Sequence, residues 1–291
     1  MWLPWQYAVM IGAGLALAGW AVRPVQRRWV ALVRPFVWES VTILLLYALW
    51  QWGGRFNVMD DRGAIARGAR ILHWQDWLPL PSELTMQRWV LPHGWLVQAC
   101  NVFYAAAHVP AMIALLVWLF AWHRERYRPV RNVLAITTAV CLFGHLVTVA
   151  PPRLLPGSGF VDTALLYNQS VYGPPGAGVS DQLAAMPSVH VLWAVLVGVA
   201  ALWATRSRWR YLVLLHPLVT MFVVAVTANH YWLDGLVAVV LIPPAWWVQD
   251  VATRWWDRRI GTTAARRRGG SPTAVGGAKL EAPTPVSGEN P

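Results

Sequence analysis

Residues 186–235 decide the fold of this chain: they begin Met186-Pro187-Ser188-Val189-His190 and end Asn229-His230-Tyr231-Trp232-Leu233-Asp234-Gly235. Two apolar runs lie between these ends, joined by a basic turn at residues 206–210. A helix rises about 1.5 Å per residue, so residues 188–205 cover roughly 27 Å, close to the hydrocarbon thickness of a bilayer. Residues 211–228 carry the chain back. We therefore predict a helical hairpin whose two ends return to the same membrane face.

Two histidines and a carboxylate should meet at that face. His190 and His230 are 40 residues apart and stand at the two open ends of the hairpin. Asp234 follows His230 by one helical turn and lies on the same side of its helix. The spacing predicts one cluster of three polar groups.

The composition is typical of a polytopic membrane protein. The 291 residues are 57% hydrophobic and only 13% charged, and 21 of them are tryptophan, which is far from the balance of a soluble domain. The formal charge of +11 does not indicate a nucleic-acid partner, because the basic residues lie between apolar runs rather than together on one face. Arginine outnumbers lysine 23 to 1, which favours a bacterial source.

The apolar runs predict an all-α helical bundle with about seven transmembrane helices, at residues 5–22, 36–52, 95–122, 132–150, 188–205, 211–228 and 231–248. We divide the chain into N-terminal transmembrane helices (1–52), an extracytoplasmic interfacial segment (53–94), a transmembrane core (95–250) and a basic, disordered cytoplasmic tail (251–291). Glu39, within the second run, is expected to pair with an arginine.

An amphipathic helix is predicted near residues 60–75. Its apolar side chains recur at helical spacing and face three arginines; they are Ile65, Ala69, Leu72 and Trp74, opposite Arg62, Arg67 and Arg70. We expect this helix to lie in the membrane interface.

The basic residues also predict the topology. Segments 23–35, 122–131, 206–210 and 251–291 hold 18 Lys and Arg, whereas segments 53–94 and 151–187 hold 6. Because basic residues concentrate in cytoplasmic loops, the end that carries the two histidines should face the extracytoplasmic side of a bacterial plasma membrane, and the C-terminus should lie in the cytoplasm.

The cluster contains the parts that phosphoryl transfer through a covalent histidine requires. Asp234 can accept a hydrogen bond from one ring nitrogen of His230, which leaves the other nitrogen with a lone pair for phosphorus. His230 is then the nucleophile. His190 can protonate the leaving oxygen and later deprotonate the incoming hydroxyl group.

Arg153 and Ser188 are the predicted phosphate-binding residues. Ser188 opens a helix whose free amides favour an anion, and Arg153 can add a bidentate contact. Two plainer roles stay open, since Ser188 can serve only as an N-cap and Arg153 only as a snorkelling interfacial residue. This chemistry needs no metal and no organic cofactor.

Met-Pro-Ser-Val-His at 186–190 and His-Tyr-Trp-Leu-Asp at 230–234 resemble the second and third signatures of the type 2 phosphatidic acid phosphatase superfamily. The chain departs from the phosphatase branch in two places: residues 150–156 lack the Lys-to-Arg-Pro first signature, and Val223-Val224 stands near the expected Ser-Arg. In these two places the chain resembles another branch of the superfamily, that of inositol phosphorylceramide synthase and sphingomyelin synthase. Further matches to bacterial members of that inositolphosphotransferase-like branch are Asn101-Val102-Phe103-Tyr104 with His108, and Gly159-Phe160-Val161-Asp162-Thr163.

The resemblance covers roughly residues 60–250 and implies a six-helix-type catalytic core. It implies a lipid phosphotransferase that takes a phosphoryl or phospho-headgroup, such as phosphoinositol, from a phospholipid or an isoprenoid- or sphingolipid-type phosphate. The acceptor would be a polar alcohol, or water if the enzyme is a lipid phosphate phosphatase. The residues alone do not choose between these acceptors.

Three other classes of function fit the sequence less well. The sequence has no His-Glu-x-x-His motif, which a zinc site would favour. It also has no Gly-x-Ser-x-Gly elbow, which a Ser188-His230-Asp234 hydrolase would need. A proton-coupled transporter would use Glu39 with the histidines at 108, 145 and 216 as a relay, but no internal repeat supports it. We expect His108, His145 and His216 to be satisfied hydrogen-bonding groups inside the bundle, and Asp162 to be a solvated loop charge.

Overall fold

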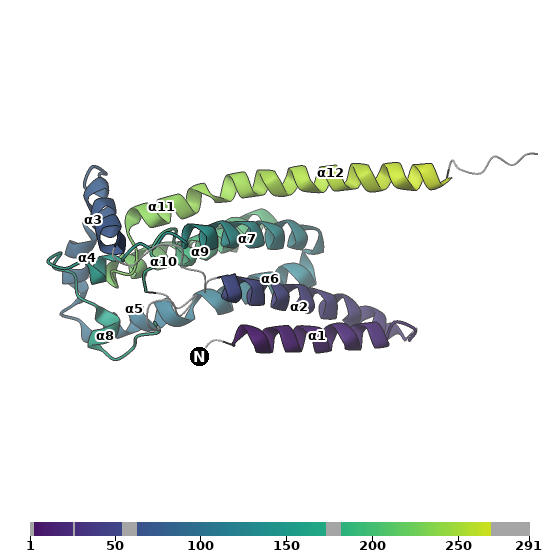
Figure 1. The fold of residues 1–291 in the computed structure, drawn as a ribbon, viewed down its shortest axis with the longest axis horizontal. Helices are drawn as coiled ribbons and strands as arrows, with labels where there is room; N and C mark the ends of the chain where they lie inside the picture. The colour runs from purple at the N-terminus through teal and green to yellow at the C-terminus, as the bar shows by residue number, and fades with distance from the viewer. Residues whose placement is uncertain (1–2, 26, 54–62, 173–181, 269–291) are drawn as a thin grey trace, which may run out of the picture. The chain divides into compact units, whose positions relative to one another are not determined.

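The computed structural model describes residues 3–25, 27–53, 63–172 and 182–268. Regular structure in these ranges is helical apart from one isolated pairing of Val149 with Ala184, which confirms the all-α class. The helices, shown in Figure 1, are α1 (Trp5–Ala21), α2 (Arg28–Gly53), α3 (Ala64–Gln75), α4 (Glu83–Val90), α5 (Gly94–Ala106), α6 (His108–Trp122), α7 (Arg124–Gly144), η2 (Pro152–Leu154), α8 (Thr163–Leu166), α9 (Val189–Ala204), η4 (Arg208–Leu214), α10 (Leu215–Val226), α11 (Trp232–Val240) and α12 (Ile242–Arg268).

The length and hydropathy of several helices indicate membrane association. Within the described ranges, Arg208–Val226 and Trp232–Arg259 are long and apolar enough to cross a bilayer, with mean hydropathies of 1.7 and 1.5. Helices α5 and α6 form a third candidate if the bent pair is one span, and α9 is a shorter apolar helix. The expected total of seven spans stays a prediction.

The expected span over residues 95–122 is broken in two. Helices α5 and α6 meet at Ala107 and are bent by 48°. Pro110 explains the break, because proline has no N–H to donate to the Ala106 carbonyl and its ring clashes with that carbonyl. The bend starts α6 at His108, which is buried among the helices around the histidine pair.

The second arm of the hairpin is also irregular at its start. Residues 208–214 form a 3₁₀ segment before α10 begins at Leu215. Pro217, in the first turn of α10, cannot donate to a carbonyl in the preceding turn, so regular α-helical bonding starts late. The arm nevertheless returns the chain to the end from which α9 starts.

The chain divides into two compact units, Met1–Gln249 and Asp250–Pro291. In the second unit, α12 continues to Arg268, and the expected division of the chain stays a prediction. An ion pair between Arg254 and Asp250 at i,i+4 and the stacking of Arg259 over Trp255 favour the helix. The rest of the expected tail lies outside the described residues.

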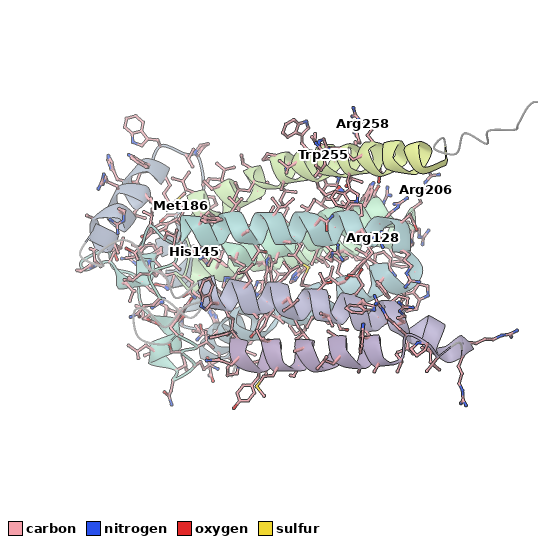
Figure 2. The ribbon with its side chains drawn as sticks, turned by 45° about the vertical axis from the view of Figure 1, so that its right-hand side comes forward. Arg128, His145, Met186, Arg206, Trp255 and Arg258 are labelled. Carbon is pink, nitrogen blue, oxygen red and sulfur yellow. The ribbon has the colours of Figure 1, made fainter. Side chains whose placement is uncertain are left out.

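The first unit has a polar end that carries the histidines and an opposite end rich in arginine. Figure 2 shows His145 and Met186 at one end of the helices, and Arg128 and Arg206 at the other. Glu39 of α2 pairs with Arg131 of α7, as expected for an arginine partner. The separation of the ends agrees with the distribution of charge along the sequence.

Helix α3 covers the end that carries the histidines. Its exposed side chains include Ile65 and Trp74, whereas Leu72 of the same predicted face packs against the protein, so only part of the apolar face predicted for the membrane interface is exposed. The buried face is a different stripe, made by Ala64, Gly68, Ile71 and Gln75. Helix α3 thus uses small residues to approach the protein and leaves large apolar side chains outside.

Gly68 permits the closest approach. A Cβ atom at this position would lie 2.4 Å from the Ala150 carbonyl oxygen and 2.7 Å from the Tyr231 hydroxyl oxygen. These two oxygens are hydrogen-bonded at 2.7 Å, and Tyr231 directly follows His230. Gly68 therefore connects the placement of α3 to the site.

The Gly68→Ala variant is expected to be less stable by about 1–3 kcal/mol, because the added methyl group must push α3 away from rigid backbone. Thermal unfolding in detergent measures this effect. The control is Gly14→Ala in α1, where an added Cβ meets nothing within 4 Å. The control should gain up to about 1 kcal/mol from helix propensity. Equal midpoints for the two variants would contradict the close contact.

Candidate active site

His190 is held in the first turn of α9. Ser188 is the N-cap, and its hydroxyl oxygen accepts a hydrogen bond from the Val191 amide at 3.3 Å. The Ser188 side chain is fully buried in this role. The N-cap expectation is therefore met, whereas a direct contact of Ser188 with phosphate stays a prediction.

His230 is placed by the turn that ends α10. Ala228 adopts a left-handed conformation with φ of 51°, and the Asn229 amide donates to the Val224 carbonyl at 3.2 Å. This is a Schellman turn with alanine where glycine is usual, and it costs roughly 1 kcal/mol of backbone strain. The turn directs His230 back toward α9.

The two histidines face each other directly. His190 Nδ1 lies 3.3 Å from His230 Nε2. His230 Nδ1 lies 2.7 Å from the Ala185 carbonyl oxygen, which can only accept a hydrogen bond. His230 therefore carries its proton on Nδ1, and Nε2 presents a lone pair toward His190.

Asp234 contacts both the backbone at the start of α11 and the ring of His230. Its Oδ2 accepts from the Tyr231 amide at 2.8 Å and lies 3.5 Å from His230 Nδ1. The nearest acceptor for His230 Nδ1 is thus the Ala185 carbonyl, and Asp234 is a second, longer contact. Asp234 fixes the backbone that carries the histidine and adds negative charge behind its ring.

Glu83 of α4 supports the same helix start. Its carboxylate accepts from the Trp232 amide at 3.0 Å and from the Gln75 side chain at 2.7 and 2.8 Å. Burial raises the pKa of this carboxyl group. Together with Asp234, Glu83 occupies the free amides at the N-terminus of α11, where negative charge is favourable.

Arg153 is locked beside the histidines. Its Nε donates to Asn229 Oδ1 at 2.8 Å, and its Nη1 donates to Asp162 Oδ2 at 2.7 Å. The guanidinium also lies over the Tyr172 ring, 4.4 Å from the centroid. Nη2 is buried and has no hydrogen-bond partner among residues 3–25, 27–53, 63–172 and 182–268. Arg153 Nη2 is therefore a rigidly held donor group that can bind an anion.

Comparison with models of protein families identifies the family of this chain. The family model of the PAP2 superfamily matches residues 69–248, which include both histidines, Asp234 and Arg153. The chain belongs to the PAP2 superfamily. Comparisons with curated proteins and with solved structures found no match.

Membership in the PAP2 superfamily indicates a phosphatase- or phosphotransferase-type enzyme. It indicates lipid phosphates as substrates and water or an alcohol as acceptor. The apolar helices agree with membrane association. The branch within the superfamily and the role of each residue stay predictions.

The loop that carries Arg153 in this PAP2 protein is held by two buried side-chain amides, of which only Asn101 lies in a stretch that the sequence singled out. Gln87 donates to the carbonyls of Val161 and Val226 at 2.9 and 3.0 Å. Asn101 donates to the Thr163 carbonyl at 3.0 Å and accepts from the Thr163 hydroxyl at 2.8 Å. These bonds tie the 161–163 segment to α4, α5 and the end of α10.

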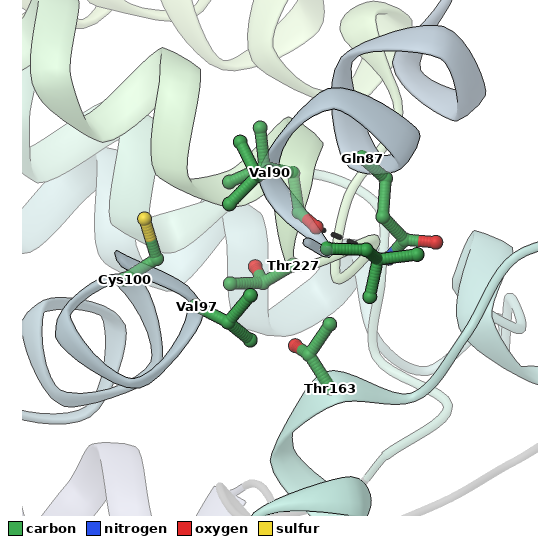
Figure 3. A pocket seen from close by; sticks show the side chains of 8 residues that line it. Gln87, Val90, Val97, Cys100, Thr163 and Thr227 are labelled. Carbon is green, nitrogen blue, oxygen red and sulfur yellow. Dashed lines mark hydrogen bonds between the residues drawn. The ribbon is translucent and has the colours of Figure 1, made fainter. Parts of the chain in front are cut away.

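Gln87 and Thr163 also line the pocket in Figure 3, together with Val90, Val97, Cys100 and Thr227. The side chains leave no room there for a water molecule. The pocket is a packing seam that fixes the loop, and it is not a substrate site.

The remaining histidines behave differently from one another. His145 Nε2 lies 2.9 Å from the Pro187 carbonyl oxygen, so its expected structural hydrogen bond is confirmed. The expectation is wrong for His108, whose two ring nitrogens are buried without a hydrogen-bond partner in the described part of the chain. His216 Nε2 is also buried without such a partner there. Glu39 pairs with Arg131, so the carboxylate that a proton-coupled transporter would use in its relay is already neutralised.

Sequence reasoning missed most of the partners that hold the PAP2 site. Asp162 was expected to be a solvated charge, but its carboxylate pairs with Arg153 and also caps α8. Asn229, Tyr172 and Tyr104 are close to the site through contacts between segments far apart in sequence. Short matches around residues 101–104 and 159–163 pointed to Tyr104 and Asp162, and no sequence signal pointed to Tyr172.

Proposed function

We propose that the protein is a membrane lipid phosphotransferase that works through a phosphohistidine on His230. The observation that carries the proposal is the orientation of the His230 ring. Its Nδ1 is bonded to the Ala185 carbonyl at 2.7 Å, while Nε2 faces His190 at 3.3 Å. A histidine nucleophile needs this division, with one nitrogen protonated and the other unprotonated.

In the first step, the Nε2 lone pair of His230 attacks phosphorus and forms an N–P bond. The bond between phosphorus and the leaving oxygen of the donor lipid breaks, and its electron pair stays on that oxygen. Protonated His190 gives a proton to this oxygen. Substrate binding replaces the resting hydrogen bond between the two rings.

In the second step, His190 takes the proton of the acceptor hydroxyl group as its oxygen attacks phosphorus. The N–P bond breaks and its electron pair returns to Nε2 of His230. The product carries the phosphoryl or phospho-headgroup, such as phosphoinositol. Both histidines then have their starting protonation, and no metal or organic cofactor takes part.

Arg153 is the proposed phosphate-binding group. Its Nη2 is a buried donor without a partner in the described ranges, and its other nitrogens are fixed by Asn229 and Asp162. A guanidinium held in this way stabilises charge on phosphate oxygens without reorganisation during the reaction. Ser188 supports the site as the N-cap of α9. In this proposal, the phosphate binds close to Ser188, at the N-terminus of that helix.

We place the site on the extracytoplasmic side of a bacterial plasma membrane. The support is the arginine-rich end with Arg128 and Arg206, which lies opposite the end with His145 and Met186 (Figure 2). The proposed divisions are residues 1–52, 53–94, 95–250 and the C-terminal segment from 251, with the exposed face of α3 in the membrane interface. The donor would be a phospholipid or an isoprenoid- or sphingolipid-type phosphate.

The test is phosphate transfer by the purified protein in detergent, with labelled phospholipids and with or without inositol or another alcohol. Label transferred to the alcohol supports the transferase, in line with the inositolphosphotransferase-like branch. Release of inorganic phosphate alone supports a phosphatase that uses water. Absence of both products across a broad lipid panel would overturn the proposal.

The Arg153→Lys variant sharpens this test. Lysine cannot keep the forked contacts to Asn229 and Asp162 and still present a donor, so kcat/KM should fall roughly 100-fold. The matched control is Arg70→Lys on the exposed face of α3, which should keep wild-type activity. Equal activity of both variants would remove Arg153 from phosphate binding.

A further inference from the structure

The hydroxyl group of Tyr104 lies at the reacting nitrogen. Tyr104 comes from α5 and is 6% exposed. Its Oη lies 3.5 Å from His230 Nε2 and 2.5 Å from the Tyr172 hydroxyl oxygen. The hydroxyl group is thus within reach of the atom that would bond to phosphorus.

The partners of Tyr172 fix the direction of these hydrogen bonds. Tyr172 donates its single proton to Asn229 Oδ1 at 3.0 Å, and that oxygen can only accept. The same oxygen accepts from Arg153 Nε. Tyr104 must therefore be the donor in its contact with Tyr172, so in the resting site its proton points to Tyr172 and has to turn to reach a group bound at His230 Nε2.

The Tyr104 ring also packs on the second histidine. Its centroid lies 4.2 Å from that of His190, with the planes 29° apart. His190 also forms a T-shaped contact with His108, with ring centroids 4.6 Å apart and the planes at 83°. Tyr104 thus touches both proposed catalytic histidines, one through its hydroxyl group and the other through its ring face.

We propose that Tyr104 is a further catalytic residue of the phosphoryl transfer described above, and this inference rests on that proposed function. Its O–H turns from Tyr172 to a non-bridging oxygen of the phosphoryl group on His230 Nε2 and donates a hydrogen bond to it. Tyr104 keeps its proton throughout, so the bonds made and broken at phosphorus are unchanged. The hydrogen bond stabilises the charge that gathers on the phosphoryl oxygens in the transition state.

The experiment compares Tyr104→Phe with the wild type in single-turnover labelling by a lipid phosphate. Phenylalanine keeps the ring on His190 and removes only the hydroxyl group. The rate of phosphohistidine formation should fall roughly 30- to 100-fold, whereas KM should change less than about 2-fold. The control is Tyr127→Phe, which removes a buried hydroxyl group from α7 that bonds Glu39 and should leave the rate unchanged.

A second variant separates the two contacts of the ring. Tyr104→Leu removes the stacking as well as the hydroxyl group, so it should lose more activity than Tyr104→Phe and also shift the pH profile that reports His190. Thermal unfolding of each variant shows whether the fold is intact. A loss that follows a drop in stability would assign Tyr104 a structural role only and overturn the inference.

The two proposals fail in different ways. An adduct that forms at the wild-type rate in Tyr104→Phe would overturn the role of Tyr104 and leave the phosphohistidine mechanism standing. Absence of an adduct in the wild type would overturn the mechanism itself.

Discussion

The His230→Ala variant is expected to lose roughly four to six orders of magnitude in turnover and to form no phosphorylated protein. The reason is that the variant has no atom in place of Nε2 to attack phosphorus. His190 lies on the side that Nε2 faces, but its ring is stacked on that of Tyr104 and takes the acid and base role in the proposal. The measurement is transfer of labelled phosphate from a lipid donor to the protein, detected as an acid-labile, base-stable adduct.

The matched control is His73→Ala. His73 lies on α3 and its side chain is 73% exposed, so it should label like the wild type. An adduct that persists in His230→Ala and vanishes in His190→Ala would reverse the roles of the two histidines. Proton-dependent flux abolished by a change at His145 or His216, with no adduct in any protein, would favour a transporter.

The His190→Ala variant is expected to stop after the first step. With a donor lipid whose leaving oxygen is acidic, the P–O bond can break without a proton, so the adduct on His230 should form at a useful rate. Activation of the acceptor then fails, and the phosphoprotein should accumulate. Turnover of a donor with a poor leaving group should fall roughly 10³- to 10⁴-fold.

The measurement for this variant is a time course of adduct and product with two donors that differ in the acidity of the leaving group. Accumulation with the acidic donor and almost no labelling with the other supports His190 as acid and then base. Equal labelling rates with both donors would show that His190 does not protonate the leaving oxygen.

The sequence predicted that His190, His230 and Asp234 would meet, because two apolar runs of bilayer length must return the chain to one face. The structure brings them together at 3.3 and 3.5 Å. Their chemical roles remain proposals. What the spacing could not predict is the main acceptor of His230 Nδ1, because the Ala185 carbonyl is reached only through the pairing of Val149 with Leu183 and Ala185.

Breaks in the helices and the packing of α3 were predicted less well. Pro110 lies in a mainly apolar run, and hydropathy alone does not register the bond that proline removes. The buried stripe of α3 includes Gly68 and Gln75, which an apolar pattern does not select. Small size and side-chain hydrogen bonding decide that contact, and both depend on the partner surface.

The Nδ1 atom of His230 is held by a main-chain oxygen, that of Ala185. No side-chain substitution can delete a carbonyl group, so the protonation form of this proposed nucleophile is a property of the backbone path. Residues that contact the donor and acceptor can therefore change while the attacking nitrogen stays the same. This would let one scaffold adopt new lipid headgroups over evolutionary time without rebuilding its chemistry.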